Sequence, residues 1–436
     1  MALHQTARFG LAQQAVKGTA AAGWDVPYIR GRVLQHGMSP RYEMIDTAGE
    51  HTGVHSRSTA LQSTPIRAGS IIDVSFRHRL YPSMVGLELI GLGFTAATST
   101  ISILTIDATG GTFTLTVSGQ TTAAITYAVT LTAATIDTAI ELLSTVGADG
   151  ATVTGSNGGP YTITLNSSVT ASTFTADGAL LTGGAGTAVF SGWYYTHVFT
   201  LPAADNEGWL TGYSFIGESS GFGLVARDVR LSQLTFTADK TGIIVAGSGL
   251  GLAEADAAGT ETFTPEVDAV LSQANGAFTL TSTDITAATL GTPRSHTLTL
   301  DNPLDDSEQE LHTMNRATLS PTGKTVTGTI AGLVFSENIF KEMWWGGAGG
   351  TAVAIPYPVS TGFTYNWQSA SNISTTAAVP YKLTFSIPIV QFEMAPFDLT
   401  SGGQVVYDCA YRMTDAISTS PISLTLVNDT PSYAGT

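Results

Sequence analysis

Residues 111–130 read GTFTLTVSGQTTAAITYAVT, and this stretch decides the fold class. Apolar Phe113, Leu115 and Val117 alternate with threonines, and a period of two is typical of a strand with one buried face. Ser118-Gly119-Gln120 supplies a turn, after which a second apolar run begins. The stretch therefore predicts two strands joined by a tight turn.

The residues that follow predict a helix and then another hairpin. In residues 133–150, AATIDTAIELLSTVGADG, apolar residues at i, i+4 and i+7 indicate a helix, and Gly147 indicates its end. Residues 151–168, ATVTGSNGGPYTITLNSS, predict a hairpin with a glycine-rich turn. We expect a self-contained β-β-α-β-β unit, inserted as an outward-facing domain over residues 95–190.

Composition narrows the class of protein. The 436 residues include 18 basic and 34 acidic side chains, a formal net charge of −16. Charged residues make up only 12% of the chain and hydrophobic residues 43%, which excludes a disordered polyelectrolyte. The acidic balance argues against a protein that grips nucleic acid by counterion release. The single cysteine, Cys409, excludes an intramolecular disulfide and a cysteine-based zinc site.

Charge is spread unevenly along the chain. Residues 1–94 have a net charge of +3, residues 95–190 of −5 with no Lys or Arg, and residues 191–436 of −14, so the breaks are candidate boundaries. Residues 1–20 lack the apolar run of a signal peptide. Long uncharged stretches are rich in Thr, Ser and Gly, which predicts strands rather than membrane-spanning helices.

The regions that flank the insert predict an internal repeat with an offset of 255 residues. In both copies a strand, at 71–76 and at 326–330, leads into a short helix that has an apolar stripe and ends at glycine. We expect a mainly all-β fold of two tandem sandwich or barrel domains, residues 1–94 with 191–255 and residues 256–436, each with a flanking helix. The aligned pairs are Leu80/Phe335, Met84/Ile339, Val85/Phe340, Leu89/Trp344, Ile90/Trp345 and Gly91/Gly346.

Several motifs resemble parts of catalytic or metal sites without the rest. Ser219 lies in a G-x-S-x-G pattern, but the residues after it alternate like a strand, whereas a nucleophile elbow needs a helix there. His51 and His55 are spaced i, i+4, yet Gly53 and the surrounding Ser and Thr favour a solvated loop over a metal site. We predict no enzyme activity, no cofactor and no metal, with a hydrolase using Ser219 as an alternative.

Two further groups are candidates for contacts with other chains. Asp301, Asp305 and Asp306 belong to an acidic run without the spacing of a calcium loop, which predicts a solvated or electrostatic contact surface. Trp344 and Trp345 are adjacent, so on a helix they point about 100° apart. One is expected to face the sheet and the other a neighbouring subunit.

Longer stretches resemble a known family. Residues 13–31 (QQAVKGTAAAGWDVPYIRG) and 56–94 resemble the opening of the tail tube, or major tail, proteins of long-tailed non-contractile bacteriophages. Residues 228–251 (DVRLSQLTFTADKTGIIVAGSGLG) resemble the middle hairpin of that family, and 294–306 with 323–347 its second half. The strands YKLTFSIPIV and PISLTLVND continue the likeness, and the insert resembles a small β-rich domain of virion structural proteins. One departure is Gln14, where the family pattern leads us to expect an acidic residue.

The resemblance implies a function. Such proteins form rings, here of three chains that mimic six-fold symmetry, which stack into a hollow tube around a tape-measure protein and later conduct double-stranded DNA. The tube is part of the virion, is assembled in the host cytoplasm, and meets terminator and tip proteins at its ends. The resemblance implies no membrane partner, and an acidic lumen would let DNA slide.

Ring stacking suggests specific residues. The basic N-terminal region could bridge to an acidic face of the adjacent ring, and the residues we expect there are Arg57, Arg67, Arg77 and Arg79 against Asp301, Asp305 and Asp306. A competing expectation is another β-rich tail, baseplate or adhesin protein, which would form discrete oligomers without extended tubes.

Overall fold

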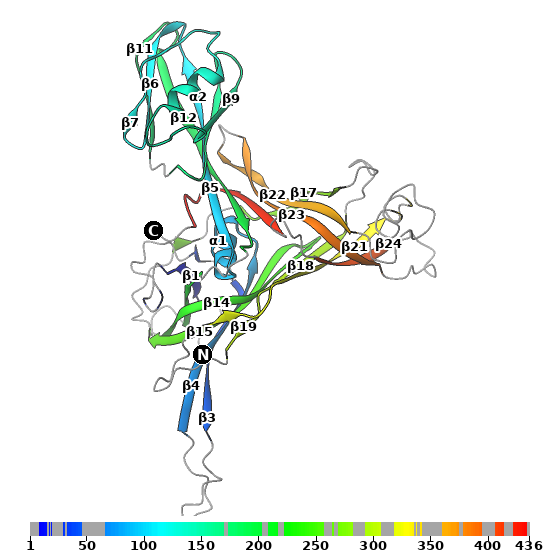
Figure 1. Ribbon diagram of the computed structural model, residues 1–436. Helices are drawn as coiled ribbons and strands as arrows, with labels where there is room; N and C mark the ends of the chain where they lie inside the picture. Colours follow the sequence, from blue (N-terminus) through cyan, green and yellow to red (C-terminus); the bar gives the residue numbers. More distant parts are fainter. Residues whose placement is uncertain are drawn as a thin grey trace, which may run out of the picture.

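Figure 1 shows the computed structural model, in which a body of long strands carries a separate lobe on one side and a long hairpin on the other. Within the described residues no helix is long and apolar enough to cross a membrane. The described residues are 8–14, 17, 19, 29–30, 33–45, 66–169, 173–202, 208–216, 222–256, 264–265, 269–281, 293–306, 318–334, 337, 341, 360–374, 378–394, 406–413 and 422–433.

The described residues are mostly β-strand, with antiparallel pairing between the long strands, which confirms the expectation of a mainly all-β fold. The body has two layers. One layer, called layer B, combines strands from both halves of the chain, because β14 pairs with β18. Its order is β3 (Val33–Ile45), β4 (Ile66–Arg79), β15 (Gly242–Asp256), β14 (Phe222–Asp239), β18 (Ser295–Asp301), β21 (Thr325–Val334) and β24 (Val406–Met413).

The other layer, called layer A, also mixes the two halves, because the last strand β25 pairs with both β12 and β23. Its order is β5 (Thr95–Asp107), β12 (Thr187–Thr200), β25 (Ser423–Asn428), β23 (Val379–Met394), β22 (Ser360–Ser374) and β17 (Ser272–Thr281). The layers are joined where β23 pairs with β24. Remaining short strands are β1 (Arg8–Gln13), β2 (Ile29–Arg30), β13 (Leu210–Ile216), β16 (Thr264–Pro265), β19 (Leu304–Asp305) and β20 (Ser320–Pro321).

Alternation explains how the layers pack. In β18 the burial pattern alternates along the strand, so His296, Leu298 and Leu300 face the core while the residues between them face outward. The ring centroids of Phe236 in layer B and Phe385 in layer A are 5.3 Å apart. Each such ring contributes about 2–3 kcal/mol by burial. One apolar core therefore runs through both halves, and the boundary between the two halves stays a prediction.

Helix α1 (Pro82–Gly91) fills the space beside β14 and β25. Pro82 begins the helix, where its missing N–H costs nothing, and Gly93 follows with a φ of 94°, which favours glycine. The predicted apolar stripe is buried, but so is almost all of the helix, including Glu88. In the second copy, Glu337 and Lys341 are helical and form an ion pair of 2.6 Å.

The lobe formed by the insert has its own apolar core, built from residues between Leu104 and Ala188. The sequence predicted its elements: two hairpins flank α2 (Ala133–Glu141), whose Ile136 and Ile140 are fully buried. Strands β5 and β12 continue from layer A into this lobe, with a register shift between Ser191 and Tyr194. The other strands are β6 (Gly110–Val117), β7 (Gln120–Thr121), β8 (Ile125–Thr126), β9 (Ala151–Gly155), β10 (Tyr161–Leu165) and β11 (Phe174–Thr182).

Gln14 is held by a partner far away in the sequence. Its side chain is buried beside Asp228, donating from Nε2 to the Asp228 carboxylate at 2.9 Å and accepting from the Asp228 backbone N–H at 2.7 Å. A carboxylate at position 14 would face the carboxylate of Asp228 and could not donate to it. The amide therefore suits this partner, which lies 214 residues away in sequence.

Candidate assembly surfaces

The described side chains that could act in catalysis or bind a metal are either buried or far from one another. Among the described residues no group of His, Cys, Asp and Glu could hold a metal ion. Burial raises the thiol pKa of Cys409 to about 12 and lowers the pKa of His296 to about 3, so both are neutral near pH 7. Ser219, His51 and His55 lie outside the described residues. The surfaces that could contact other chains are therefore distinguished by their charge and their place on the two layers.

The residues expected at ring contacts separate into two places. Arg57, Trp344 and Trp345 lie outside the described residues, and of Arg67 only its place in β4 is described. The others lie on layer B: Arg77, Arg79, Asp301, Asp305 and Asp306. Strand register shows that the arginines and aspartates do not meet within one chain.

The register of β4 and β18 gives the separation. Arg79, the last residue of β4, pairs with Ile244, close to the turn between β14 and β15. Asp301, the last residue of β18, pairs with Gln233 of β14. Gln233 lies six residues before Asp239, where β14 ends and the turn to β15 begins. Arg294 stands just before the first residue of β18. Arg294 and Asp301 therefore mark opposite ends of layer B, about 20 Å apart at 3.3 Å per residue.

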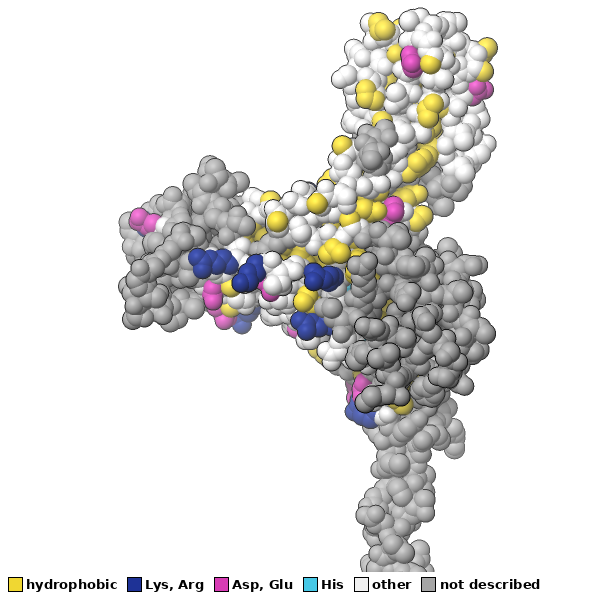
Figure 2. All heavy atoms as spheres, turned by 180° about the vertical axis from the view of Figure 1, so that it is seen from behind, with side chains coloured by type: hydrophobic (Ala, Val, Ile, Leu, Met, Phe, Trp, Pro, Cys, Tyr) yellow, Lys and Arg dark blue, Asp and Glu magenta, His cyan; other side chains and the backbone are white. Residues whose placement is uncertain are grey.

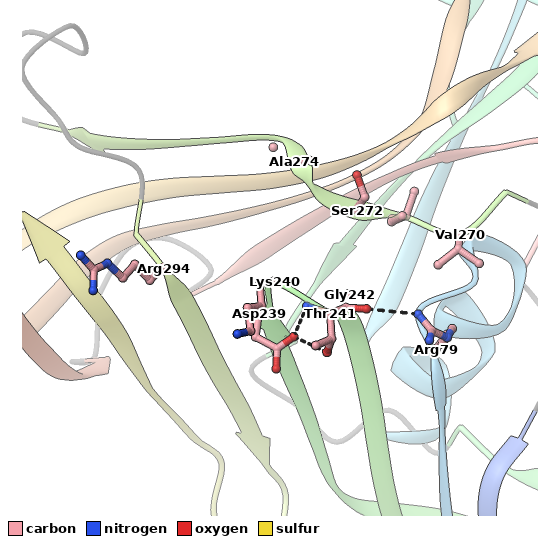
Figure 3. Close-up of a pocket in the computed structure, with 11 residues that line it drawn as sticks. Arg79, Asp239, Lys240, Thr241, Gly242, Val270, Ser272, Ala274 and Arg294 are labelled. Carbon is pink, nitrogen blue, oxygen red and sulfur yellow. Dashed lines mark hydrogen bonds between the residues drawn. The ribbon is translucent and has the colours of Figure 1, made fainter.

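One end of layer B holds a basic pocket of about 570 Å³ (Figure 3). Arg79, Lys240 and Arg294 line it, and Arg79 donates from Nη1 to the Thr241 carbonyl at 3.3 Å. Asp239 is the acid in its lining; its carboxylate accepts from the Thr241 hydroxyl at 2.5 Å and from the Thr241 N–H at 2.6 Å. These bonds lower the pKa of Asp239. Three cations therefore line the pocket with one carboxylate, and that carboxylate already accepts hydrogen bonds from Thr241 in the adjoining turn.

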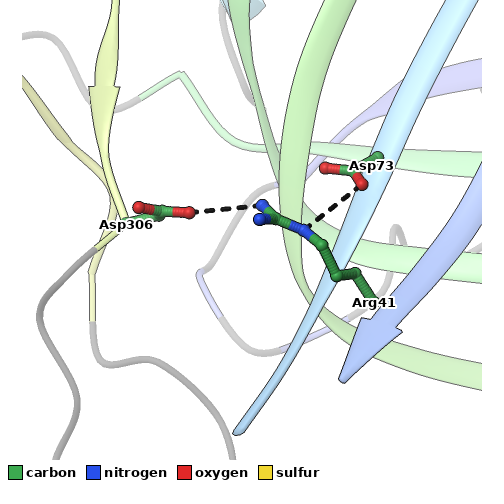
Figure 4. Close-up of polar contacts among 3 residues, drawn as sticks. All are labelled: Arg41, Asp73 and Asp306. Atoms are coloured by element: carbon green, nitrogen blue, oxygen red, sulfur yellow. Dashed lines mark hydrogen bonds and ion pairs between the residues drawn. The ribbon is translucent and has the colours of Figure 1, made fainter. Parts of the chain in front are cut away.

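The opposite end forms an acidic rim, which we define as Asp73, Asp301, Asp305 and Asp306. Arg41 of β3 lies between two of these carboxylates, with Nε 3.4 Å from Asp73 and Nη2 3.3 Å from Asp306 (Figure 4). All three side chains are about half exposed, so each ion pair contributes at most about 1 kcal/mol. The contact joins the β3–β4 hairpin to the second half of the chain.

Sequence reasoning missed Arg41, Lys240 and Arg294. Arg41 and Asp306 are 265 residues apart, so no local pattern connects them. Lys240 lies in the turn between β14 and β15, and Arg294 immediately precedes β18. The pairing of β14 with β18, which no local pattern predicts, brings these two cations to the same end of layer B.

Between these two ends, the exposed face of layer B carries small polar side chains in register. Arg77, Ala246, Thr235, Thr299 and Thr327 stand side by side across five strands. The hydroxyls of Thr235 and Thr299 are 3.3 Å apart. The rows on either side include Ser75, Ser248, Thr237, Thr297, Thr329 and Thr325, together with Arg79 toward the basic pocket and Asp301 at the opposite end. This face, called the hydroxyl face, is neutral at its centre, and Arg77 and Arg412 stand at the two sides of its central row.

Among the strands of the body that have six or more residues, three have an unpaired side. Within the described residues β3 pairs only with β4, β17 only with β22, and β1 only with β13. Such edges present backbone N–H and C=O groups that can pair with another chain. At 13 residues, β3 is the longest of the three.

The charged groups themselves divide between body and insert. Figure 2 shows Lys and Arg side chains across the body and none on the face of the insert that it displays. Comparison with known proteins adds no assignment to this geometry: no protein-family model matches the chain, and no curated protein is significantly similar to it.

Proposed function

We propose that the chain is a structural subunit that assembles into the hollow tail tube of a long-tailed, non-contractile bacteriophage. Rings of three chains stack into the tube, which surrounds a tape-measure protein and then passes double-stranded DNA. Terminator and tip proteins close the two ends. In this proposal, the protein is a component of the virion and is assembled in the host cytoplasm.

The observation that carries the proposal is the construction of layer B. Strands from both halves of the chain form one continuous antiparallel layer, and the long β3 at its side has a free edge within the described residues. Pairing with a neighbouring subunit would remove this edge, and closure of a ring would remove it in every subunit. Since each chain contributes two halves to the layer, three chains supply six similar segments.

The position of the insert supports one orientation of the layers. The lobe extends from β5 and β12, which belong to layer A (Figure 1). A domain with its own core is too large for a channel that must also pass a nucleic-acid duplex. Layer A therefore faces outward in the proposed tube, and the hydroxyl face of layer B lines the channel.

The chemistry of the hydroxyl face suits a passing polyanion. Lys and Arg hold DNA because they replace counterions at its phosphates, so a surface with few cations lacks that attraction. The threonines across the centre of the face carry no charge, and Thr235 and Thr299 lie within hydrogen-bonding distance of each other. The duplex would slide over a hydrated surface that is neutral at its centre, with Arg77 and Arg412 at its sides, which differs from the acidic lumen that we expected.

Electron microscopy of the purified protein, followed by thiol labelling, tests the proposal. Wild-type protein should form long hollow tubes or three-fold rings. Thr299→Cys on layer B and Thr384→Cys on layer A are matched variants, because both residues are half-buried threonines that point away from the core. Cys409 is fully buried and gives little background reaction.

In tubes, a bulky polyethylene-glycol maleimide should label Thr384→Cys at least about tenfold faster than Thr299→Cys, whereas a small maleimide should reach both. Discrete oligomers without tubes at all concentrations would reject the tube and favour a baseplate or adhesin role. Tubes in which Thr299→Cys reacts with the bulky reagent as fast as Thr384→Cys would reject the orientation alone.

A further inference from the structure

The basic pocket contains cations that have no ion-pair partner among the described residues. Among the described residues Lys240 and Arg294 form no ion pair, and Asp239 is engaged by Thr241. All three cations of the pocket are exposed, so their charge is available to an approaching group. The pocket is open, and its other wall is formed by residues 270–276, which include the start of β17 (Figure 3).

The acidic rim retains charge at the other end of the same layer. Asp301 accepts from Gln233 Nε2 at 2.6 Å and from the Thr325 hydroxyl at 3.5 Å, and both partners are neutral. Arg41 lies between Asp73 and Asp306, so one cation serves two carboxylates. Asp301 therefore forms no ion pair among the described residues, although Lys324 lines the same small cavity, and its charge remains available at this end of the layer.

We propose that the basic pocket binds carboxylates of the acidic rim of a second copy of this chain, stacked head to tail along the strands of layer B. This inference rests on the proposed tube and names the contact that joins one ring to the next. The two surfaces cannot meet within one chain, because Arg294 and Asp301 lie at opposite ends of the seven-residue strand β18 and are about 20 Å apart.

A contact between two different surfaces that advances each copy along an axis cannot close, so it produces a filament when every copy presents both surfaces. Each exposed ion pair is weak, at about 0.2–1 kcal/mol. A ring of three chains makes three such contacts at once, and the linked contacts reinforce one another. Stacking should therefore weaken steeply with salt while the rings, which depend on strand pairing, persist.

The contact proposed here differs from the one expected from sequence. Arg79 and the aspartates remain candidates, but Arg77 stands within the hydroxyl face, beside Ala246. Lys240 and Arg294 take its place beside Arg79. On the acidic side Asp301 is the leading carboxylate, because Asp306 is already bound by Arg41.

Charge exchange in the full-length chain tests this contact. Lys240→Glu with Arg294→Glu should lower the fraction of protein that sediments as tubes about tenfold at low salt, because like charges then face each other. Asp301→Lys should lower sedimentation less, because three carboxylates of the acidic rim remain. The combination of all three substitutions in one chain should recover part of the sedimentation lost in Lys240→Glu with Arg294→Glu, since the cation placed at position 301 then faces the carboxylates placed at positions 240 and 294.

Lys382→Glu is the matched control, because Lys382 lies on the outward face of layer A and should leave sedimentation unchanged. Size-exclusion chromatography should still show rings for every variant. Tubes that form normally from Lys240→Glu with Arg294→Glu, with unchanged salt dependence, would overturn the contact while leaving the tube intact. Failure of the triple variant to recover would overturn the acidic rim as the partner, and absence of tubes from wild type would overturn both proposals.

Discussion

The insert and the body are both mainly β-structure, yet they are assembled from contacts of very different range. In the insert, β9 and β10 form a hairpin of sequence neighbours, and the whole core comes from residues between Leu104 and Ala188. In the body, Thr196 pairs with Val427, and the core extends from the first described strand to Tyr433. The insert is a local structure, whereas the body holds the two ends of the chain together.

Their titratable chemistry differs in the same way. Residues 104–190 contain no His, Lys or Arg, so the insert carries only acidic charge. The body buries His197 and His296, and burial lowers their pKa values to about 4 and about 3. Each imidazole is held neutral in the folded state, although it would be half protonated near pH 6.5 in an unfolded chain. Acid should therefore distinguish the two regions.

The largest expected effect is acid destabilisation of the body. Since both histidines have lower pKa values when folded than when unfolded, their full contribution is present above about pH 6.5 and is lost as the pH falls toward 4 and 3. At about pH 4.5 the two together should cost about 5 kcal/mol. Urea unfolding at neutral and acidic pH, followed by tryptophan fluorescence of the body, measures the loss.

His296→Phe should remove about half of this pH dependence, because the site is surrounded by Phe363, Tyr365 and Trp367. The variant also loses the hydrogen bond to the Tyr411 hydroxyl. This loss lowers stability at every pH, so it does not change how steeply the free energy of unfolding depends on pH. An unchanged slope in His296→Phe would contradict the assignment. The insert, observed by its own hydrogen exchange, should show no comparable loss over this range.

A smaller effect should come from glycine substitutions, one within α1 and one in the turn that follows α2. A Cβ at Gly86 of α1 would lie 2.2 Å from the ring of Tyr433, which is buried and donates from its hydroxyl to the Ser83 carbonyl. Gly86→Ala should therefore lower the free energy of unfolding of the body by about 1–3 kcal/mol through overpacking, despite better helix propensity. Differential scanning calorimetry of full-length protein would report it as a lower Tm.

Gly147→Ala beside α2 is the control within the insert. No atom lies within 4 Å of a Cβ there, but the φ of 76° favours glycine. The expected cost is about 1 kcal/mol of backbone strain and is limited to the insert. Equal losses in both variants would mean that Tyr433 moves aside easily and that the C-terminal contact with α1 is not tight.

The difference in sequence separation between the contacts of the insert and those of the body also explains what the sequence could predict. The alternation from Phe113 to Val117 and the spacing of Ile136 and Ile140 depend only on neighbours, so the insert was predicted element by element, and its helix and hairpins are confirmed. The strand after Ser219 is confirmed as β14 for the same reason. The all-β class follows from many such local patterns.

The arrangement of the layers was not accessible in this way. That β25 lies between β12 and β23, or that Arg41 reaches Asp306, depends on strand pairing between residues far apart in sequence. The basic pocket exists because β14 pairs with β18. A single sequence contains no period or motif that indicates such pairing, so it shows which residues carry charge but not which of them the fold brings together.

The smallest effect should follow removal of the insert, if it is as independent as its core indicates. Thr95–Thr100 still pair within the body, so the cut belongs farther along β5, where Ile103 pairs with Ser191. A two-residue Asn-Gly turn can join these antiparallel strands. Deletion of residues 104–190 should change the stability of the body by less than about 1 kcal/mol and leave tube formation intact, because no other strand of the body pairs with the removed lobe among the described residues. Loss of tubes with a normally folded body would show that the insert contacts neighbouring subunits, and the body would then no longer be the sole unit of assembly.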